Sequence, residues 1–440
     1  MSNLAKIARM GIIAVASALA LASVPLAAHA ADTPPDRIIA GGNTGFSDIR
    51  GLALDPGGTI YESDRSSIRI FAPGADGDAT PMRVIAGPAT TISALEQIAV
   101  DSTGLIYVTD TNVGGVLVFA ATAMGDVAPI RTIAGAATGL ISVSGIALDS
   151  AGNIYVSDVY SKSIKVFAAG ASGDVAPIRT IAGATTGLDS PWGLEVDSDG
   201  ELYVVNYNSL AVTVYGPAAN GDAAPIRTIS GASTDMDLPY DVAIDSIGDL
   251  LVANYNSSTI NVYAAGADGD VAPYRNIQGG STQVNGPFPI ALDVADNLYV
   301  GNWDNKSITV YASPIAITGV TPSSGTAGAE VTITGRGFTG ATTVTFGGVA
   351  ASSVTVLNST TIVARAPEGP SGTVDVVVSD GGDAATATAA FTYAPVLAET
   401  GTDAASVGLL ALTLIGFGLV LFVTKRRGRT PGERQATLIR

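Results

Sequence analysis

The chain has 440 residues, with 22 Lys and Arg against 39 Asp and Glu, no Cys, and a single His, His29. Its formal net charge of −17 repels phosphate backbones, so nucleic-acid binding is not expected. Disulfides are excluded by the missing cysteines, and one histidine near the N-terminus cannot supply a zinc site, a Ser–His triad or a histidine general base.

The first 30 residues have the organisation of a secretory signal peptide. Lys6 and Arg9 precede an apolar stretch, Met10–Leu26, and residues 28–30 (Ala-His-Ala) form a small-x-small cleavage site. We therefore expect residues 1–30 to be removed on export, together with the only histidine.

Six copies of a unit of about 48 residues follow, between Arg37 and Tyr311. Each copy has an Asp that ends a short apolar run: Asp55, Asp101, Asp149, Asp197, Asp245 and Asp293. Each then has a strand-like run ending in Asp or Asn: Asp64, Asp110, Asp158, Asn206, Asn254 and Asn302. Each also has an aromatic residue that ends a third run: Phe71, Phe119, Phe167, Tyr215, Tyr263 and Tyr311. One such unit cannot bury its apolar face alone, so the copies must pack on one another.

Within each copy, four short runs alternate apolar and polar residues between Gly, Asp, Ser and Pro turn signals, which predicts four strands and hence a propeller blade. The repeat is out of phase at its ends, because a fourth strand precedes the first blade and none follows Tyr311. We therefore expect residues 36–40 to complete the last blade beside 290–293, 297–302 and 307–311, which closes the ring and hides both edges.

The blade pattern G-[IV]-A-[VL]-D-x-x-G-x-[IL]-Y-V-x-[DN] resembles the NHL-repeat family of six-bladed propellers. The resemblance implies a propeller domain over residues 31–312. It says little about function, because this fold is widely reused.

From residue 313 to 394 the period changes to short Thr-, Val- and Gly-rich strands, which predicts an immunoglobulin-like β-sandwich. The run from Gly328 to Phe338 resembles the core motif of the IPT/TIG family. We interpret this domain as a spacer. The expected fold class is therefore all-β, with a six-bladed propeller, an Ig-like sandwich and a C-terminal transmembrane helix.

The C-terminal segment 395–440 resembles a Gram-positive sortase sorting signal. Its parts are a pentapeptide, an apolar run at 407–423 and a basic tail at 424–440. The pentapeptide consists of Leu397, Ala398, Glu399, Thr400 and Gly401. The resemblance implies a membrane-spanning precursor, cleavage by a sortase after Thr400 and attachment to peptidoglycan. Ala398 in place of Pro is the form associated with high-GC Gram-positive bacteria. We therefore expect an exported protein of the cell wall, whose chain 31–400 carries a formal charge of −23.

One face of the propeller is expected to bind a ligand, because the loops before strand one and after strand two lie on the same side. These loops in blades three to six carry aromatic residues beside amides, with Tyr160 in blade three, and they suit a surface glycan or a protein ligand. The candidate binding residues are Trp192, Tyr240, Phe288, Tyr207, Tyr255, Trp303, Asn206, Asn254 and Asn302. The alternative is that these rings only pack between neighbouring blades.

The remaining polar landmarks are interpreted without a ligand. Each Asp before an x-x-Gly turn accepts that turn's backbone N–H groups, and Asp197–Gly200 lacks the other ligands of a calcium loop. The Arg that follows an Asp by five residues, as in Asp126 and Arg131, is interpreted as a surface ion pair. We expect no catalytic residue, no metal site and no cofactor.

The sequence thus favours a sortase-anchored binding or adhesion protein. A calcium-dependent lactonase or hydrolase is an alternative, in which Asn206, Asn254, Asn302 and Asp158 would converge near the axis with calcium as cofactor. A purely structural surface protein is the second alternative.

Overall fold

The computed structural model describes residues 32–338, 341, 343–379 and 384–394. These residues form strands and short 3-10 helices, which confirms the all-β class. None of their helices is long and apolar enough to cross a membrane. The predicted signal peptide (1–30), sortase motif (397–401) and apolar span (407–423) lie outside the described residues. The chain divides into a compact unit that ends at Pro395 and a second unit, Val396–Arg440, which also lies outside them.

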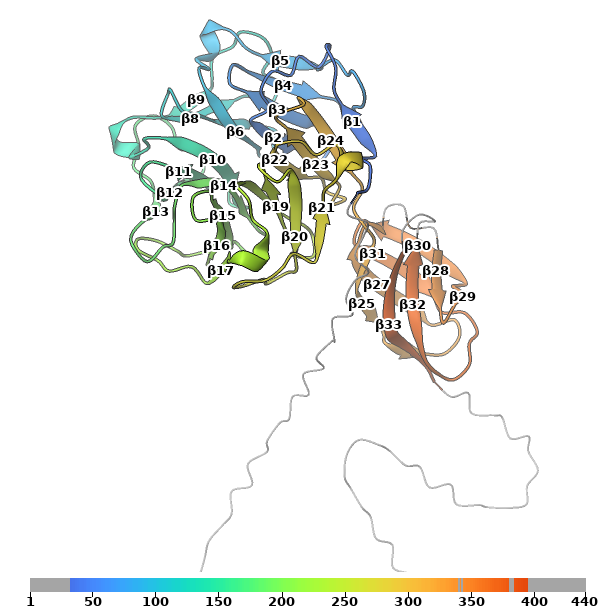
Figure 1. Ribbon diagram of the computed structural model, residues 1–440. Helices are drawn as coiled ribbons and strands as arrows, with labels where there is room; N and C mark the ends of the chain where they lie inside the picture. Colours follow the sequence, from blue (N-terminus) through green and yellow to red (C-terminus); the bar gives the residue numbers. More distant parts are fainter. Residues whose placement is uncertain (1–31, 339–340, 342, 380–383, 395–440) are drawn as a thin grey trace, which may run out of the picture. The chain divides into compact units, whose positions relative to one another are not determined.

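Six antiparallel four-stranded sheets, here called blades one to six, follow one another in a propeller-like arrangement (Figure 1). Blade one is β2 (Gly51–Leu54), β3 (Ile60–Asp64), β4 (Ser67–Phe71) and β5 (Arg83–Ile85). Blade two is β6 (Leu95–Val100), β7 (Ile106–Asp110), β8 (Gly115–Phe119) and β9 (Arg131–Ile133). Blade three is β10 (Val143–Leu148), β11 (Ile154–Asp158), β12 (Ser163–Phe167) and β13 (Arg179–Ile181). Blade four is β14 (Pro191–Val196), β15 (Leu202–Asn206), β16 (Ala211–Tyr215) and β17 (Arg227–Ser230). Blade five is β18 (Pro239–Ile244), β19 (Leu250–Asn254), β20 (Thr259–Tyr263) and β21 (Arg275–Ile277). Blade six is β22 (Pro287–Leu292), β23 (Leu298–Asn302), β24 (Ser307–Tyr311) and β1 (Arg37–Ile39). The 3-10 helices are η1 (Pro88–Thr90), η2 (Ala136–Thr138), η3 (Ala232–Thr234) and η4 (Gly280–Thr282).

The N-terminal strand closes the ring, as the phase of the repeat predicts. Strand β1 pairs antiparallel with β24, and Ile39 lies opposite Ile308. Asp36 extends one end of this ladder, because its N–H donates to the Val310 carbonyl at 2.8 Å and its carboxylate accepts the Ala312 N–H at 2.6 Å. Strand β24 is therefore paired on both sides, and blade six has four strands like the other blades.

The core of the propeller lies between blades. Each of the six interfaces between successive blades holds its own cluster of buried apolar side chains. The cluster between blades six and one contains Ile39, Ile49, Ile60 and Ile308, all with 0% exposure. The junction of blades six and one therefore has a buried apolar cluster, as the other junctions do.

A second contact, between a glycine and an aspartate, joins each blade to the next, and we call it the clasp. Gly87 has φ 127°, and a Cβ at that position would lie 2.5 Å from the Asp126 carboxylate, so only glycine fits there. The same carboxylate accepts the Ala89 N–H at 2.6 Å. Five further copies repeat this clasp, and the last joins Gly279 and Ser281 to Asp32, whose carboxylate accepts the Ser281 N–H at 2.7 Å. Asp32 therefore completes the ring from just beyond the predicted signal peptide.

This clasp corrects the expected surface ion pair. Asp126 contacts Gly87 and Ala89, whereas Arg131 donates to the Ala171 carbonyl at 3.2 Å and to the Tyr107 hydroxyl at 3.0 Å. The constant spacing of five residues suggests a local ion pair. In the structure the Asp126 carboxylate instead contacts the loop after blade one. The Arg131 guanidinium contacts Ala171 of blade three and Tyr107 of its own blade.

The turn Asp residues are used as the sequence predicts. In blade two, Asp101 accepts the N–H groups of Thr103 at 2.9 Å and Leu105 at 3.0 Å. Tyr107 donates its hydroxyl to the other carboxylate oxygen of Asp101 at 3.1 Å, and Arg131 donates to the same hydroxyl. These hydrogen bonds thus link the turn after strand β6 to strand β7 and to the outer strand β9.

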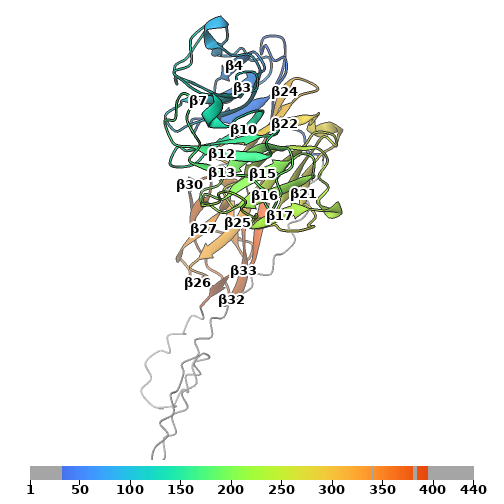
Figure 2. The ribbon, with the colours of Figure 1, turned by 90° about the vertical axis from the view of Figure 1, so that its left-hand side faces the viewer.

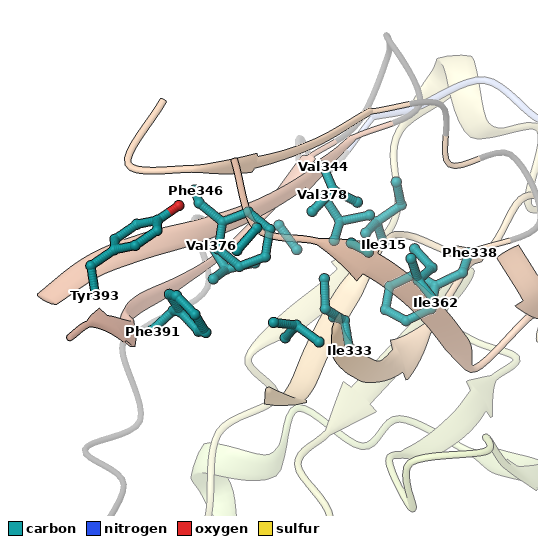
Figure 3. Close-up of a cluster of buried hydrophobic side chains, with 14 residues drawn as sticks. Ile315, Ile333, Phe338, Val344, Phe346, Ile362, Val376, Val378, Phe391 and Tyr393 are labelled. Atoms are coloured by element: carbon teal, nitrogen blue, oxygen red, sulfur yellow. The ribbon is translucent and has the colours of Figure 1, made fainter. Parts of the chain in front are cut away.

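The second domain is a sandwich of two sheets (Figure 2). One sheet has the order β25 (Ala316–Thr321), β27 (Glu330–Arg336), β31 (Thr361–Arg365) and β30 (Ser353–Asn358). The other has the order β26 (Ser324–Gly325), β33 (Ala384–Tyr393), β32 (Gly372–Ser379), β28 (Thr343–Phe346) and β29 (Val349–Ala350). Phe346, Phe391 and Tyr393 stack edge to face between the sheets, beside Ile333 and Val376 (Figure 3). The sandwich therefore has a core of its own.

Blade five departs from the repeat where it meets Arg336 of the sandwich. Leu251 stands where the other blades have a tyrosine in strand two. Tyr274 stands where blades one to four have Ile or Met before the outer-strand Arg. Arg336 is 3% exposed; it forms ion pairs with Asp245 and with Asp249, the latter at 3.1 Å, and it donates to the Tyr274 hydroxyl at 3.3 Å. Because losing one partner of a buried ion pair is costly, this contact holds the sandwich to blade five.

Candidate functional site

Two positions in each blade define the candidate binding face. The first lies five residues before the turn Asp: Arg50, Glu96, Ser144, Trp192, Tyr240 and Phe288. The second follows the buried Asp or Asn that ends strand two: Arg65, Thr111, Val159, Tyr207, Tyr255 and Trp303. At both positions blades four to six carry rings, whereas blades one to three carry charged, small or aliphatic residues. The face is therefore aromatic on one half only.

Strand irregularities present the first set of rings. The pairing of strands one and two shifts register between Pro191 and Leu194 in blade four, and between Pro287 and Ile290 in blade six. A comparable shift follows Pro239 in blade five. Such bulges re-aim side chains next to functional sites. The same shift follows Leu95 in blade two and Val143 in blade three, so the bulge belongs to the repeat, and in blades four to six it falls at the rings.

All six predicted aromatic residues meet in one connected cluster, which we call the aromatic patch. Tyr240 lies at its centre, with ring centroids 4.9 Å from Trp192, 5.1 Å from Tyr207, 5.6 Å from Tyr255 and 4.2 Å from Phe288. Trp303 joins it through Phe288 at 5.1 Å. The six rings that the sequence groups on one face thus lie in contact with one another.

The patch combines blade packing with accessible surface. Phe288 is buried, whereas Trp192, Tyr207, Tyr240, Tyr255 and Trp303 are each partly exposed. Burial raises the pKa of Tyr240, so its hydroxyl stays protonated and able to donate throughout the physiological range. The Tyr255 hydroxyl donates to Asp304 at 3.2 Å. Packing and ligand binding are therefore not exclusive here, because Phe288 supports rings that remain partly open.

A charged cluster missed by the sequence reasoning borders the patch. The guanidinium of Arg50 lies 3.7 Å from the ring centroid of Trp303 and 5.4 Å from that of Phe288. Arg50 is 5% exposed and pairs with Asp48 at 3.0 Å and Glu96 at 3.2 Å. Burial raises the pKa of Glu96, while the two arginines Arg50 and Arg65 oppose this. Arg50 could have been found from the sequence, since it occupies the same repeat position as Trp192.

Asn206, Asn254 and Asn302 lie beneath the face, inside the sheets, with 0% exposure. Each amide oxygen accepts a backbone N–H from the loop before strand one: those of Asp189 at 2.9 Å, Asp237 at 3.1 Å and Asn285 at 3.0 Å. The amide nitrogens donate within their own blades, as Asn206 does to Thr213 at 2.9 Å. These amides therefore position the loops that carry the rings.

The alternative calcium site needs the same amides together with Asp158. Asp158 is also 0% exposed; it accepts the Ile141 N–H at 2.7 Å and pairs with Lys165 at 3.2 Å. Within the described part of the chain, no group of three or more carboxylates or histidines could hold a metal ion. The arrangement supports ring stacking and charge-assisted hydrogen bonding more directly than metal chemistry.

Comparison with known proteins identifies the second domain. Residues 314–393 match the IPT/TIG domain, as the motif from Gly328 to Phe338 predicts. No curated protein matches the chain at a significant level.

Solved structures similar to the chain include a lyase, a WD40 β-propeller domain and a protein of unknown function. A streptogramin B lyase structure is 13% identical, covering 66% of this chain and 90% of that chain, with a TM-score of 0.44. The WD40 β-propeller domain of Doa1 is 11% identical, covering 64% and 94%, with a TM-score of 0.44. A structural genomics protein of unknown function from Bacteroides thetaiotaomicron is 16% identical, covering 60% and 69%, with a TM-score of 0.46. Similarity this low says nothing about activity.

Proposed function

We propose that the protein is a cell-surface binding protein whose aromatic patch holds an extended glycan or peptide. The observation that carries this proposal is the division of the face. Six rings gather over blades four to six, whereas blades one to three have charged, small or aliphatic residues at the same positions. Partly exposed rings suit the C–H faces of sugars and the side chains of peptides.

The charged cluster gives the ligand a direction. A chain lying across the face would stack on Tyr240 and Trp192 at one end and meet the Asp48, Arg65 and Glu96 side chains at the other. Arg65 is the most accessible member of this cluster, because its side chain is 50% exposed. Sugar hydroxyls and peptide backbone groups can both donate to and accept from such residues.

The binding test uses residues 31–395, which contain all six inter-blade clusters and the sandwich core. Glycan and peptide arrays would be probed with this segment and with Tyr240→Ala. We expect selective binding that the variant weakens at least ten-fold. Tyr160→Ala is the matched control, since that tyrosine is 77% exposed on blade three and outside the patch. Equal binding by wild type and Tyr240→Ala would refute the assignment.

Adding calcium tests the alternative that the protein is a calcium-dependent hydrolase. A calcium-dependent hydrolase should show a higher melting temperature with calcium than with chelator, whereas a protein that binds through rings should not. A calcium-dependent shift together with an unselective array would favour the hydrolase.

We also propose that the protein belongs with NHL-type propellers and is anchored by a sortase at Thr400. This part rests on the repeat pattern and on the pentapeptide, apolar run and basic tail of the C-terminal segment. Thr400→Ala should leave the protein in the membrane fraction instead of covalently attached to the wall. If digestion of the wall released wild type and variant equally, sortase anchoring would be wrong.

A further inference from the structure

One edge of the aromatic patch already holds an arginine of the chain itself. The guanidinium of Arg50 lies 3.7 Å from the ring centroid of Trp303, and it pairs with Asp48 at 3.0 Å and with Glu96 at 3.2 Å. A guanidinium is planar and delocalised, so it can stack on a ring and donate to carboxylates in its own plane at the same time. The patch thus holds one arginine by a ring face and by neighbouring carboxylates together.

The same combination recurs around Tyr255, where none of the described arginines lies over the ring. Tyr255 is partly exposed, and its ring centroid lies 5.6 Å from that of Tyr240. Its hydroxyl donates to the Asp304 carboxylate at 3.2 Å. The carboxylate of Asp237 accepts the amide of Asn256, the next residue after Tyr255, at 2.8 Å. Both carboxylates therefore contact neutral donors, and neither forms an ion pair with a described residue.

The loops around the rings are acidic as a whole. In blades four to six, the loops before strand one are residues 182–190, 231–238 and 278–286, and those after strand two are 207–210, 255–258 and 303–306. They contain four acidic residues and one base: Asp189, Asp235, Asp237, Asp304 and Lys306. Asp189 is paired with Lys162 of blade three at 2.7 Å. The aromatic half of the face therefore complements a positively charged ligand.

We propose that the aromatic patch binds an arginine side chain of an extended peptide on a partner protein, with the guanidinium stacked on Tyr255 and paired with Asp304. This inference rests on the function proposed above and names a cationic peptide as the ligand. The rest of the peptide would lie over Tyr240 and Tyr207, whose partly exposed rings are 5.1 Å apart. Arginine is favoured over lysine, because an ammonium group has no plane with which to stack.

Charge separates this ligand from the other candidates. The chain 31–400 has a formal charge of −23, which repels an anionic glycan and a second copy of the chain alike. A neutral glycan can stack on the rings but leaves Asp237 and Asp304 without a counter-charge. A cationic peptide uses both the rings and the carboxylates, and the acidic field also speeds its encounter with the face.

The test is calorimetric titration of residues 31–395 with a capped peptide of alternating glycine and arginine. Two matched peptides replace arginine by lysine, or by citrulline, which keeps the planar shape without the charge. We expect the arginine peptide to bind about ten-fold more tightly than the citrulline peptide, and about three-fold more tightly than the lysine peptide.

Three variants separate stacking from general attraction by an acidic protein. Tyr255→Ala removes the ring and keeps every charge, and Asp304→Asn removes the charge and keeps the shape. Each should weaken the arginine peptide about ten-fold. Asp199→Asn is the matched control, because it removes the same charge from an exposed turn between strands one and two, at the opposite end of blade four. It should bind like wild type, and thermal melts check that all three variants fold.

The proposal is overturned if the arginine peptide fails to bind wild type, or if the citrulline peptide binds as tightly. It is equally overturned if folded Tyr255→Ala keeps wild-type affinity, or if Asp199→Asn loses as much affinity as Asp304→Asn. A glycan that binds wild type but not Tyr240→Ala, without binding of the arginine peptide, would refute this inference and leave the proposed binding function intact. Absence of any ligand that depends on Tyr240 would refute both.

Discussion

Deleting residues 31–41 should destabilise the whole propeller, because this segment closes the ring. The deletion removes Ile39, which is 0% exposed, the β1–β24 ladder, and the Asp32 and Asp36 contacts. Loss of a buried isoleucine costs about 2–5 kcal/mol. The hydrogen bonds of Asp32, Asp36 and the ladder add about 1 kcal/mol each. The total reaches about 7–10 kcal/mol, comparable to the entire stability of a typical domain.

The assay is urea unfolding followed by tryptophan fluorescence, with size-exclusion chromatography at several concentrations. We expect the deletion variant to lose its cooperative transition and to associate through the exposed edge of β24 (Ser307–Tyr311). Ile39→Ala and Ile133→Ala form a matched pair, since both side chains are 0% exposed on outer strands. Each should cost about 2–5 kcal/mol without causing association. An unchanged melting curve for the deletion would refute ring closure by β1.

Three further predictions concern single side chains. Trp303→Ala should cost about 1–3 kcal/mol of stability, because it removes the stacking on Arg50 and Phe288 but no fully buried side chain. Urea unfolding measures this cost. A cost near that of Ile39→Ala would mean that Trp303 serves only in packing. Burial and the nearby carboxylates of Asp241 and Asp197 raise the pKa of Glu195 on strand β14 to about 8 in the folded protein. Folding therefore binds a proton between about pH 4.5 and 8, and stability falls as the pH rises through this window. Glu195→Ala should therefore gain about 1–3 kcal/mol over wild type from pH 5 to pH 9, and parallel pH profiles would contradict this. Arg336→Ala should lower the free energy of unfolding by about 3–5 kcal/mol, because Asp245 and Asp249 lose the guanidinium that pairs with them. Arg365→Ala, an exposed control, should lower it by less than about 1 kcal/mol. Equal costs would mean that the blade-five contact is not a buried ion pair.

The repeat made most of the fold predictable. Regular spacing of the turn Asp and of the aromatic at the end of strand three fixed the strands, and the phase of the Arg placed β1 beside β24. The role of Asp32 was missed, because it precedes the first complete copy and its partner Ser281 lies 249 positions away. Such contacts depend on the ring being closed, which a linear alignment of repeats does not display.

The candidate site was predictable in its rings but not in its polar residues. Aromatic residues in equivalent loops must converge when the blades share an axis, so Trp192, Tyr240 and Trp303 could be grouped from sequence. Asn206 was assigned to the surface because amides are frequent in binding loops, yet it is 0% exposed. Arg50 was overlooked because its chemistry differs from that of its repeat equivalents. Burial and charge pairing depend on the neighbouring blade, which the residue's own blade does not specify.

Ring closure also has a consequence for the order in which the protein can be made. Arg37 pairs with Val310, 273 positions later in the chain, so the first strand of the propeller cannot pair until the last strand of the propeller has been made. Until β24 appears, the apolar side chains of Ile49 and Ile60 lack the blade that covers them. A chain interrupted before residue 311 therefore cannot become a smaller propeller. Its apolar side chains at the junction of blades six and one stay exposed, and proteases and quality-control factors can recognise them. Only a chain that reaches β24 can bury them, so the fold distinguishes complete from incomplete chains.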